Sequence, residues 1–415
     1  MNALVAALPK VFLEKRLDSL LSSWRNKFGE HPITIELWNG KRFTLGESFG
    51  EESTLVLRIR SPEALGHLIR PSLASLGTAY VEGYVDFEGR MMDAFDKVAG
   101  FISSLRPDSE RPRLRKARHT RQLDAKSIAH HYDLSNDFYR LWLDENMVYS
   151  CAYFRSPADT LEQAQIQKID HILNKIQLQP GERLLDIGCG WGALVIRAAQ
   201  KYGARCIGIT LSRAQFDEAT QRVRQAGLQD RCEIRLQDYR DVNETFDRIT
   251  SVGMFEHVGL DNLRSYFRKI HDLLRDGGVA MNHGITLTDA ESGQTPYGGG
   301  DFIGRYVFPN GELPHVGLVL KEISAAGLET ADVENLRVHY ARTLEHWSNR
   351  FEDNAGQLKE IAGDKRYRVW RAYLAGCAYG FANRWISLHQ IVACKAGGND
   401  SYPLPLTREY MYSNA

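Results

Sequence analysis

The segment LLDIGCGWG, residues 184–192, constrains the fold more than any other part of the chain. An apolar strand pattern runs into Gly188, Gly190 and Gly192 before a helix pattern, ALVIRAAQKY, begins. Glycines let the backbone turn tightly and approach a ligand at the carboxyl edge of a parallel sheet. The spacing is GxGxG rather than GxGxxG, and Asp186 precedes the glycines. This favours a nucleoside without a pyrophosphate over a dinucleotide or a purely structural turn.

The residues after this segment alternate between strand and helix patterns. RCIGIT, CEIRLQD, FDRITSV and GVAMNHGI predict strands, and SRAQFDEATQRVRQ predicts a helix. Near the C-terminus, RVWRAYLAGCAYGFANRWISLHQ predicts one long amphipathic helix, which a short strand in IVACKA follows. Such βαβ alternation implies a parallel sheet with helices on both faces. We therefore expect an α/β fold.

A small α+β domain is predicted upstream. Residues 11–27 have helical periodicity, and ITIELWNGKRFTL alternates on both sides of Asn39-Gly40, which predicts a hairpin. Residues 54–60 predict a third strand, and Ser61-Pro62-Glu63 predicts the start of a helix. We place an accessory domain with its linker at residues 1–122 and the catalytic domain at residues 123–415.

The linker is the segment RPDSERPRLRKARHTR, between Leu105 and Arg121. It is rich in proline and cationic side chains and has almost no apolar anchors. One interpretation is a solvated tether. The alternative is a basic strip that contacts anionic phosphate headgroups.

Charge and cysteine content exclude several classes. Lys plus Arg and Asp plus Glu number 52 each, so no global field draws the chain to nucleic acid, and we expect no such partner. The six cysteines form no CxxC pair, which argues against a zinc site or a disulfide framework and fits a reducing cytoplasm. Charges from Lys10 onward interrupt the first apolar run, and no 18 consecutive apolar residues occur, so we expect neither a signal peptide nor a transmembrane helix.

Polar side chains at the next strand ends fit a nucleoside. Thr210 stands where adenosine-binding folds usually present a carboxylate to the ribose hydroxyls. Gln215, one turn into the next helix, can reach a ribose oxygen, and Asp238 can accept from the adenine amino group. Each residue alone is an ordinary surface or capping residue, but together they favour a cofactor site.

Several motifs in order then point to a family. They are YSCAYF (149–154), LLDIGCGWG, LQDYRD (236–241), SVGMFEHVG (251–259) and RYVFPNGELP (305–314). With these motifs the chain resembles the cyclopropane fatty acid synthases from about Ser127 to the C-terminus. A weaker similarity extends upstream through LGTAYVEGYVDFEGRMMDAF.

The resemblance implies a class I S-adenosylmethionine (SAM)-dependent methyltransferase fold, Rossmann-like with a seven-stranded sheet, behind a domain for lipid docking or dimer contact. It implies transfer of the SAM methyl carbon to the cis double bond of an unsaturated phospholipid acyl chain, closing a cyclopropane. The SAM contacts that it assigns are Tyr149, Ser150, Asp186, Gly188, Gly190, Gly192, Thr210, Leu211, Gln215, Asp238 and Tyr239.

The resemblance also implies a bound bicarbonate that acts as the base. The ligands that it assigns are Cys151, Glu256, His283, Ile285 and Tyr340. Glu256 would accept the bicarbonate proton, while the imidazole of His283, the amide of Ile285 and the hydroxyl of Tyr340 would donate to oxygens. Taken singly, Glu256 is a typical helix-start residue and His283 a typical core histidine.

Other positions carry less definite expectations. Cys377 aligns with a cysteine often marked as the family's active-site residue, but the reaction needs no thiolate, and a small packing residue is an equal interpretation. The segment GGGDFIGRYVFPNGELP has the composition of a lid, with Phe302, Ile303, Tyr306, Val307 and Phe308 lining an acyl tunnel; a buried connector packed on the sheet is the alternative. Gly284 and His315 depart from the family, which tends to have Thr and Ser there.

We therefore expect a cytoplasmic enzyme that works at the inner face of the membrane as a homodimer. The same fold and cofactor could instead give a methyl- or methylene-branched chain, or act on another unsaturated lipid. A third alternative is a non-catalytic lipid- or SAM-binding module, whose mark would be the loss of Glu256, His283 or Tyr340. All three are present.

Overall fold

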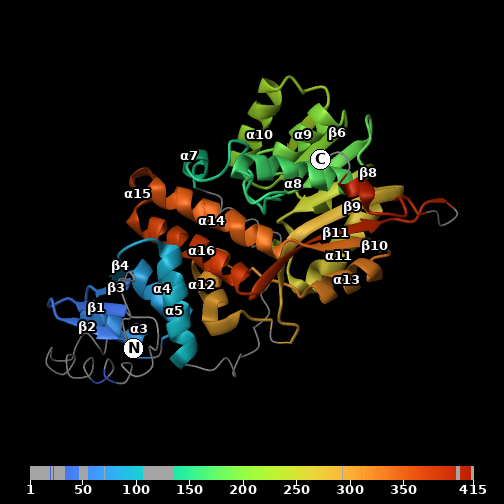
Figure 1. Cartoon of the computed structure of the whole chain (residues 1–415). Coiled ribbons are helices and arrows are strands. Elements are labelled where there is room, and N and C mark those ends of the chain that lie inside the picture. The colour runs from blue at the N-terminus through green and yellow to red at the C-terminus, as the bar shows by residue number, and fades with distance from the viewer. Residues whose placement is uncertain are drawn as a thin grey trace. The chain divides into compact units, whose positions relative to one another are not determined.

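The computed structural model describes residues 33–45, 55–69, 71–105, 134–291, 293–309, 311–398 and 402–412, with positions 19 and 22. Two compact units make up the chain, and Figure 1 labels their elements. The first comprises Met1–Arg113, Gln294–Pro309 and Phe351–Tyr379, and the second comprises Leu114–Gly293, Asn310–Arg350 and Gly380–Ala415. Two segments of the expected catalytic domain thus belong to the first unit. The expected boundary at residue 122 lies outside the described residues and stays a prediction.

The first unit contains a four-stranded sheet in the order β2-β1-β3-β4. Its strands are β1 (Ile33–Leu37), β2 (Arg42–Leu45), β3 (Leu55–Ile59) and β4 (Val85–Phe87). The predicted hairpin is confirmed, since β1 and β2 pair antiparallel around Asn39 and Gly40. Gly40 has φ +81°, a conformation that glycine adopts without strain. The third strand is also confirmed and pairs parallel with β1.

The helices of this unit come from three parts of the chain. They are η1 (Pro62–Ala64), α3 (Leu65–Leu68), α4 (Leu73–Val81), α5 (Met91–Leu105), η5 (Pro296–Gly298), α12 (Gly299–Tyr306) and α15 (Ala355–Ala362). Pro62 opens η1, close to the predicted helix start, although the Ser61 side chain makes no capping bond. The ring of Phe302 on α12 lies against Gly77 of α4, where a Cβ would be 2.7 Å from Phe302 Cδ2. The central part of the segment expected as a lid or connector is therefore a helix that packs on α4.

The second unit is built on a seven-stranded sheet in the order β10-β11-β9-β8-β5-β6-β7. The five strands from β9 to β7 are parallel to one another, and β11 is antiparallel to both of its neighbours. The strands are β5 (Arg183–Ile187), β6 (Arg205–Thr210), β7 (Cys232–Leu236), β8 (Phe246–Val252), β9 (Leu274–Leu287), β10 (Glu329–Asn335) and β11 (Ile386–Cys394). The expected α/β fold with a seven-stranded sheet is confirmed.

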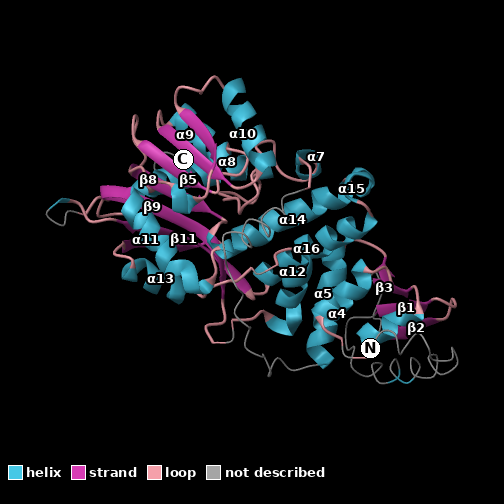
Figure 2. Cartoon of the chain, turned by 180° about the vertical axis from the view of Figure 1, so that it is seen from behind, coloured by secondary structure: helices cyan, strands magenta, loops and turns pink. Residues whose placement is uncertain are grey.

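Helices cover both faces of this sheet. They are α7 (Asn136–Arg140), α8 (Leu161–Lys175), α9 (Ala193–Lys201), α10 (Arg213–Gln225), α11 (Leu263–Leu273) and α13 (Val316–Ala325), with short turns η2 (Tyr239–Asp241), η3 (Phe255–His257), η4 (Leu260–Asn262) and η7 (Glu409–Met411). Leu184 of β5 packs in a cluster with α8 and α9, and the next residue, Leu185, packs with α11 and α13. Figure 2 shows α8, α9 and α10 grouped on one side of the strands and α11 and α13 on the other. This alternation is the period-two pattern of a strand buried on both faces.

Two helices cross the division between the units along the chain, α14 (Arg337–Asp353) and α16 (Asp364–Ala382). The single long helix expected over RVWRAYLAGCAYGFANRWISLHQ is wrong at its C-terminal end. Helix α16 ends at Ala382, Arg384 takes φ +62°, and β11 begins at Ile386. Strand β11 pairs with β9 and β10 on its two sides, and this pairing outweighs the helical pattern of its sequence. Strand β10 was not predicted.

His315, one of the two departures from the family, has a local structural role. It is the N-cap of α13, and its Nδ1 accepts from the Gly317 amide at 3.1 Å. A serine hydroxyl at this position would satisfy the same orphan amide. The helix expected over residues 11–27 and the basic linker lie outside the described residues. Among the helices that the structure describes, none is long and apolar enough to cross a membrane.

Candidate active site

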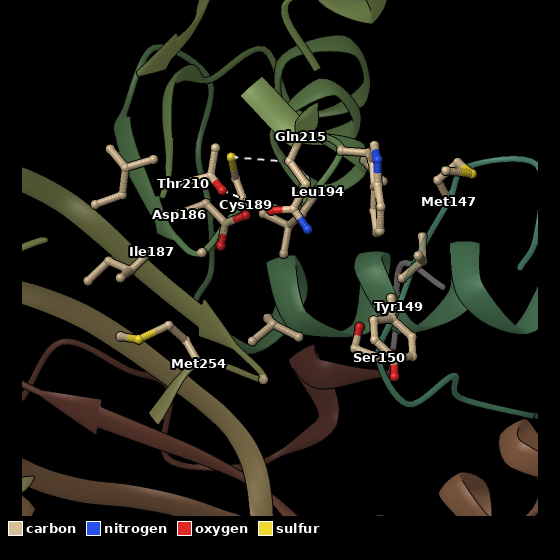
Figure 3. Close-up of a pocket in the computed structure, with 18 of the residues that line it drawn as sticks. Met147, Tyr149, Ser150, Asp186, Ile187, Cys189, Leu194, Thr210, Gln215 and Met254 are labelled. Atoms are coloured by element: carbon tan, nitrogen blue, oxygen red, sulfur yellow. Dashed lines mark hydrogen bonds between the residues drawn. The ribbon is translucent and has the colours of Figure 1, made fainter. Parts of the chain in front are cut away.

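A cavity of about 140 Å³ opens in the second unit where β5, β6 and β8 end. Residues that follow these strands line it, together with residues 147–150 and the face of α8 that carries Lys168. Figure 3 shows Asp186, Thr210 and Gln215 on one side of this space and Tyr149 and Ser150 on another. Ligands of open parallel sheets bind at such carboxyl ends.

The glycine loop forms the floor of the cavity. Gly188, Gly190 and Gly192 all have positive φ, at +81°, +54° and +85°. A Cβ on Gly188 would lie 3.1 Å from Met254 Cγ, and one on Gly192 would lie 3.2 Å from Ala219 Cβ. Nothing lies within 4 Å of a Cβ on Gly190. Packing and backbone conformation therefore both favour glycine at positions 188 and 192. At position 190 only the backbone conformation does.

Asp186 brings a buried carboxyl to the wall of the cavity. It is 3% exposed, and the Thr250 hydroxyl donates to its Oδ1 at 2.8 Å. Burial raises the pKa of Asp186 to about 6, because the surroundings solvate its charge poorly. A cationic ligand group in the cavity would lower this pKa again.

Thr210 and Gln215 form a connected pair on the opposite strand end. The Thr210 hydroxyl donates to Gln215 Oε1 at 2.8 Å and accepts from the Ser212 amide at 3.1 Å. This bond engages the side-chain oxygen of Gln215, so its NH₂ group can donate to a ligand. A ribose hydroxyl is a suitable acceptor for such a group.

Most of the expected cofactor residues line this cavity. They are Tyr149, Ser150, Asp186, Gly188, Gly190, Thr210, Leu211, Gln215 and Tyr239. Gly192 lies just beyond it, as the N-cap of α9. Asp238 is also not a lining residue, and its carboxylate receives Arg240 Nε at 2.8 Å and Nη2 at 2.6 Å. The carboxylate of Asp238 thus has an internal partner in Arg240, and its expected contact with adenine stays a prediction.

Among the cavity residues that sequence reasoning did not name are Lys168 and Met254. Lys168 lies on α8, which begins with a capping box between Thr160 and Gln163. The sequence signal for it was available, because Lys168 falls on the same helical stripe as the buried Leu161 and Ile172. A lysine on an apolar stripe needs a buried partner.

Lys168 is 2% exposed, and its Nζ donates to Ser150 Oγ at 2.7 Å. Burial lowers the pKa of Lys168 to about 8, against the attraction of Cys151, Asp144 and Asp186. Its charge also acts to lower the pKa of His283. One buried cation thus influences both the cavity and the residues assigned to the base.

Aromatic side chains continue from the cavity into the interior of the second unit. The Tyr149 ring is 5.3 Å from Trp142 and 5.3 Å from Trp347, measured between centroids. The Tyr340 ring is 6.0 Å from Trp347 and 4.6 Å from Phe381. These five rings form an aromatic cluster that leads from the cavity wall to Tyr340, and such faces stabilise cations.

Glu256 and Ile285, two of the expected base-site residues, are joined directly. The Ile285 amide donates to Glu256 Oε1 at 2.7 Å, and its expected contact with bicarbonate stays a prediction. The other carboxyl oxygen, Oε2, is buried and has no hydrogen-bond partner among the described residues. Burial raises the pKa of Glu256 to about 7, although the Ile285 bond opposes this shift.

His283 precedes Ile285 by two residues on β9 and therefore faces the same side of the sheet. It is fully buried, and its Nε2 has no hydrogen-bond partner in the described part of the chain. Burial, with Lys168 and Lys175 as further causes, lowers the pKa of His283 well below its usual value. The imidazole is therefore neutral at physiological pH.

Cys151 and Tyr340 meet at the start of α14. Cys151 Sγ lies 3.9 Å from the Leu336 carbonyl oxygen, to which the Tyr340 amide also donates at 3.0 Å. The thiol is fully buried, and burial raises its pKa far above the usual value. Cys151 is therefore a thiol rather than a thiolate, as the expected weak S–H contact requires.

Cys377 lies on α16, in the part of the helix that belongs to the first unit, and is not one of the residues that line the cavity. Burial raises the pKa of its thiol to about 12. No cation opposes that shift, so nothing in its surroundings activates it as a nucleophile. The packing interpretation of Cys377 is the better supported one.

Comparisons with known proteins agree with this architecture. The family model described as mycolic acid cyclopropane synthetase matches residues 119–391. A second model, described only as a domain of unknown function, matches residues 20–103. The cavity and all the expected site residues lie within residues 119–391, the range that the first model matches.

Relatives with names cover most of the chain. A probable fatty acid methyltransferase of Pseudomonas putida is 45% identical over 92% of this chain and 96% of its own length. A cyclopropane-fatty-acyl-phospholipid synthase of Escherichia coli is 36% identical over 81% of this chain and 87% of its own.

A solved structure gives the same result. A mycolic acid cyclopropane synthase in complex with SAH and CTAB is 37% identical, with a TM-score of 0.63, over 65% of this chain and 98% of its own. Its fold is that of the class I SAM-dependent methyltransferases, as expected for the second unit. The chain therefore belongs to the mycolic acid cyclopropane synthetase family of SAM-dependent methyltransferases.

Proposed function

We propose that this enzyme transfers the methyl carbon of SAM to the cis double bond of an unsaturated phospholipid acyl chain and closes a cyclopropane ring, with bicarbonate as the base. The observation that carries the proposal is the pair of unpaired polar atoms at the base site, Glu256 Oε2 and His283 Nε2. A buried polar atom without a hydrogen-bond partner lowers the stability of a protein. A ligand that bonds to both atoms is the best explanation for such a pair in an enzyme of this family.

Bicarbonate fits these two atoms. Its hydroxyl can donate to the Glu256 carboxylate, and its oxygens can accept from the neutral His283 imidazole. Tyr340 adds a hydroxyl from the far end of the aromatic cluster. The Ile285 amide would have to exchange its Glu256 bond for one to the ligand, or hold Glu256 while the ligand is bound.

SAM fits the cavity at the strand ends. Asp186 supplies a carboxylate for the cationic part of the ligand, and the glycine loop lets its backbone approach closely. The side chain of Gln215 donates toward the ribose, and the exposed Leu211 presents an apolar surface to the adenine ring. When bound, SAM supplies the methyl group as an electrophile, and bicarbonate supplies a proton acceptor.

The protein's own contribution is to orient, to exclude water and to stabilise positive charge. An alkene is a neutral nucleophile, so the wall of the site has to place it against the methyl group. Attack by the alkene leaves a cation on the acyl chain, and the aromatic cluster that includes Tyr149 and Tyr340 supplies faces of the kind that stabilise such a charge. The raised pKa of Glu256 suits a residue that accepts a proton through a bound anion.

Phospholipid as the substrate is supported by the named function of the Escherichia coli relative. With that substrate the enzyme has to meet the membrane surface, and we place it at the cytoplasmic face as a homodimer whose N-terminal domain docks on lipid. These points go beyond the geometry of the site and depend on the family.

A second product remains open because the relative with 45% identity is named a probable fatty acid methyltransferase. If the cation loses a proton elsewhere, a methyl- or methylene-branched chain forms instead of a ring. Both reactions need the same cavity and the same aromatic cluster.

The test is mass spectrometry of the lipids formed from purified protein, SAM, bicarbonate and vesicles of monounsaturated phospholipid. Released acyl chains are fragmented to locate the added carbon. A gain of one CH₂ with loss of the alkene supports ring closure. A gain of CH₂ with the alkene retained supports the branching reaction, and no gain on any unsaturated lipid would refute both.

Two variants make the test specific. Glu256→Gln removes the proton acceptor but keeps the shape, and it should abolish product while SAM still binds. Glu360→Gln, on the exposed surface of α15, is the matched control and should leave product formation unchanged. Loss of SAM binding in Glu256→Gln would refute the separation of the base site from the cofactor site.

A further inference from the structure

Gln390 is a buried polar residue that neither the expected site nor the family assignment uses. It lies in β11, in the interior of the seven-stranded sheet, and is fully buried. In the register of the sheet it stands opposite His283 on β9 and Glu334 on β10. Directly opposed residues place their side chains on the same face, so the three form a polar row across three strands.

The face that carries this row is the one that α8 covers. Met281 and Val392, each two residues from a member of the row, pack in the cluster that contains α8. Glu334 has its own partners on that helix, Lys175 Nζ at 2.6 Å and His171 Nε2 at 2.8 Å. Gln390 and His283 contact each other instead, while Gln390 Oε1 and His283 Nε2 have no hydrogen-bond partner among the described residues.

Their contact defines the protonation of the histidine. Gln390 Nε2 lies 3.2 Å from His283 Nδ1. In this orientation of the Gln390 amide the nitrogen donates to Nδ1, so the single proton of the neutral ring lies on Nε2. Nε2 is the buried atom without a partner.

We propose that Gln390 is a positioning residue of the base site, which holds His283 as the Nε2–H tautomer so that the ring presents a donor to a bound oxyanion. The consequence for turnover rests on the proposed function, but the tautomer itself does not. In the opposite tautomer an Nε2 lone pair would meet the oxygens of the anion, and binding would be repulsive.

With the proton on Nε2, His283 and Glu256 have different roles at the base site. Glu256 Oε2 is an acceptor when ionised, and His283 Nε2–H is a donor. An anion that carries one hydroxyl and two other oxygens needs one of each, so the tautomer selects how bicarbonate is oriented. Gln390 thus acts through His283 and touches no reacting atom.

The experiment is nitrogen NMR of protein labelled with ¹⁵N-histidine, with His283→Gln used to assign the ring signals. The ring nitrogens report the tautomer directly and need neither substrate nor turnover. Wild-type protein should show His283 protonated at Nε2. In Gln390→Glu the new carboxylate accepts from the ring, so the proton should move to Nδ1. Gln390→Met, of similar size but without a donor, should show a mixture of tautomers.

Kinetics give the second readout. In both Gln390 variants kcat should fall about 10²-fold, while the affinity for SAM changes less than twofold. Ser387→Ala is the matched control, because Ser387 is also buried in β11 and bonded to Asn335, at 2.9 Å, away from His283. It should change neither the tautomer nor kcat.

Several results would overturn the proposal. One is an Nδ1–H tautomer in wild-type protein, which can be read even if the variants fail to fold. Another is Gln390→Met with full activity and an unchanged tautomer. If the wild-type tautomer is as proposed but the enzyme makes no cyclopropane, the proposed function fails and the role of Gln390 in placing the histidine proton stands.

Discussion

Replacing Glu256 by Gln should make the protein more stable at high pH. Burial raises the pKa of Glu256 from 4.5 to about 7. The folded protein therefore binds this proton more tightly than the unfolded chain does. Its ionisation penalty is small below pH 4.5, grows as the pH rises from 4.5 to 7, and is complete above 7.

The magnitude follows from the size of the shift. A shift of one pKa unit corresponds to about 1.4 kcal/mol, so a shift from 4.5 to about 7 gives a full penalty of about 3.5 kcal/mol. Between pH 5 and pH 8.5 the growing part is about 2.5 kcal/mol. Glutamine cannot ionise, and its amide oxygen can still accept from Ile285. The free energy of unfolding of Glu256→Gln minus that of wild type should therefore rise by about 2.5 kcal/mol between pH 5 and pH 8.5.

The assay is urea unfolding of both proteins at pH 5 and pH 8.5, without SAM or added bicarbonate. Glu334→Gln is the control with the opposite sign. Although burial alone would raise it, His171 and Lys175 lower the pKa of Glu334 to about 2, so its stabilising contribution is complete above pH 4.5. Glu334→Gln should be less stable than wild type at both pH values.

A constant difference between Glu256→Gln and wild type at the two pH values would refute the reasoning, because it would mean that Glu256 ionises as freely in the folded protein as in the unfolded chain. The proposed acceptor role would then lose its electrostatic basis.

Three further changes test other parts of the site. Lys168→Met removes a buried ammonium from the cavity wall, and SAM affinity measured by calorimetry should fall about tenfold, a loss of about 1.4 kcal/mol. Gly284→Ala places a Cβ within the ring of Phe255, so urea unfolding should show a loss of about 1 to 3 kcal/mol, whereas Gly356→Ala, whose Cβ meets nothing, should be neutral or stabilising. Tyr340→Phe should lower turnover in the lipid assay while SAM binding is unchanged, and a parallel loss of SAM binding would contradict its assignment to the base site.

The cofactor site could be predicted from the sequence because its signals are local. The strand before Gly188, the three glycines and the helix after them lie within one short segment, and one physical requirement explains them together. Thr210 and Gln215 follow the next strand end by the same logic. The position of Asp238 after a strand does not reveal its ion pair with Arg240, two residues later, and its expected contact with adenine stays a prediction.

Residues whose meaning depends on distant partners could not be predicted. The segment ISLHQ continues the helical pattern of α16, and only its pairing with β9 and β10 makes it a strand. Lys168 falls on an apolar stripe, but its partner Ser150 lies 18 residues away in the sequence. Gln390 is 107 residues from His283. Periodicity is a property of one segment, whereas these contacts are properties of the assembled sheet.

The structure gives a physical reason for glycine at position 284, which lies on β9 of the seven-stranded sheet. The family tends to have Thr at this position, yet any Cβ here would overlap the ring of Phe255. Phe255 is 2% exposed and immediately precedes Glu256, so the space left by Gly284 decides where the ring, and with it the start of η3, is placed. Ile285, the residue after Gly284, then holds the Glu256 carboxylate. Any side chain at 284 would require this ring to move, so the glycine affects the position of Glu256 through packing.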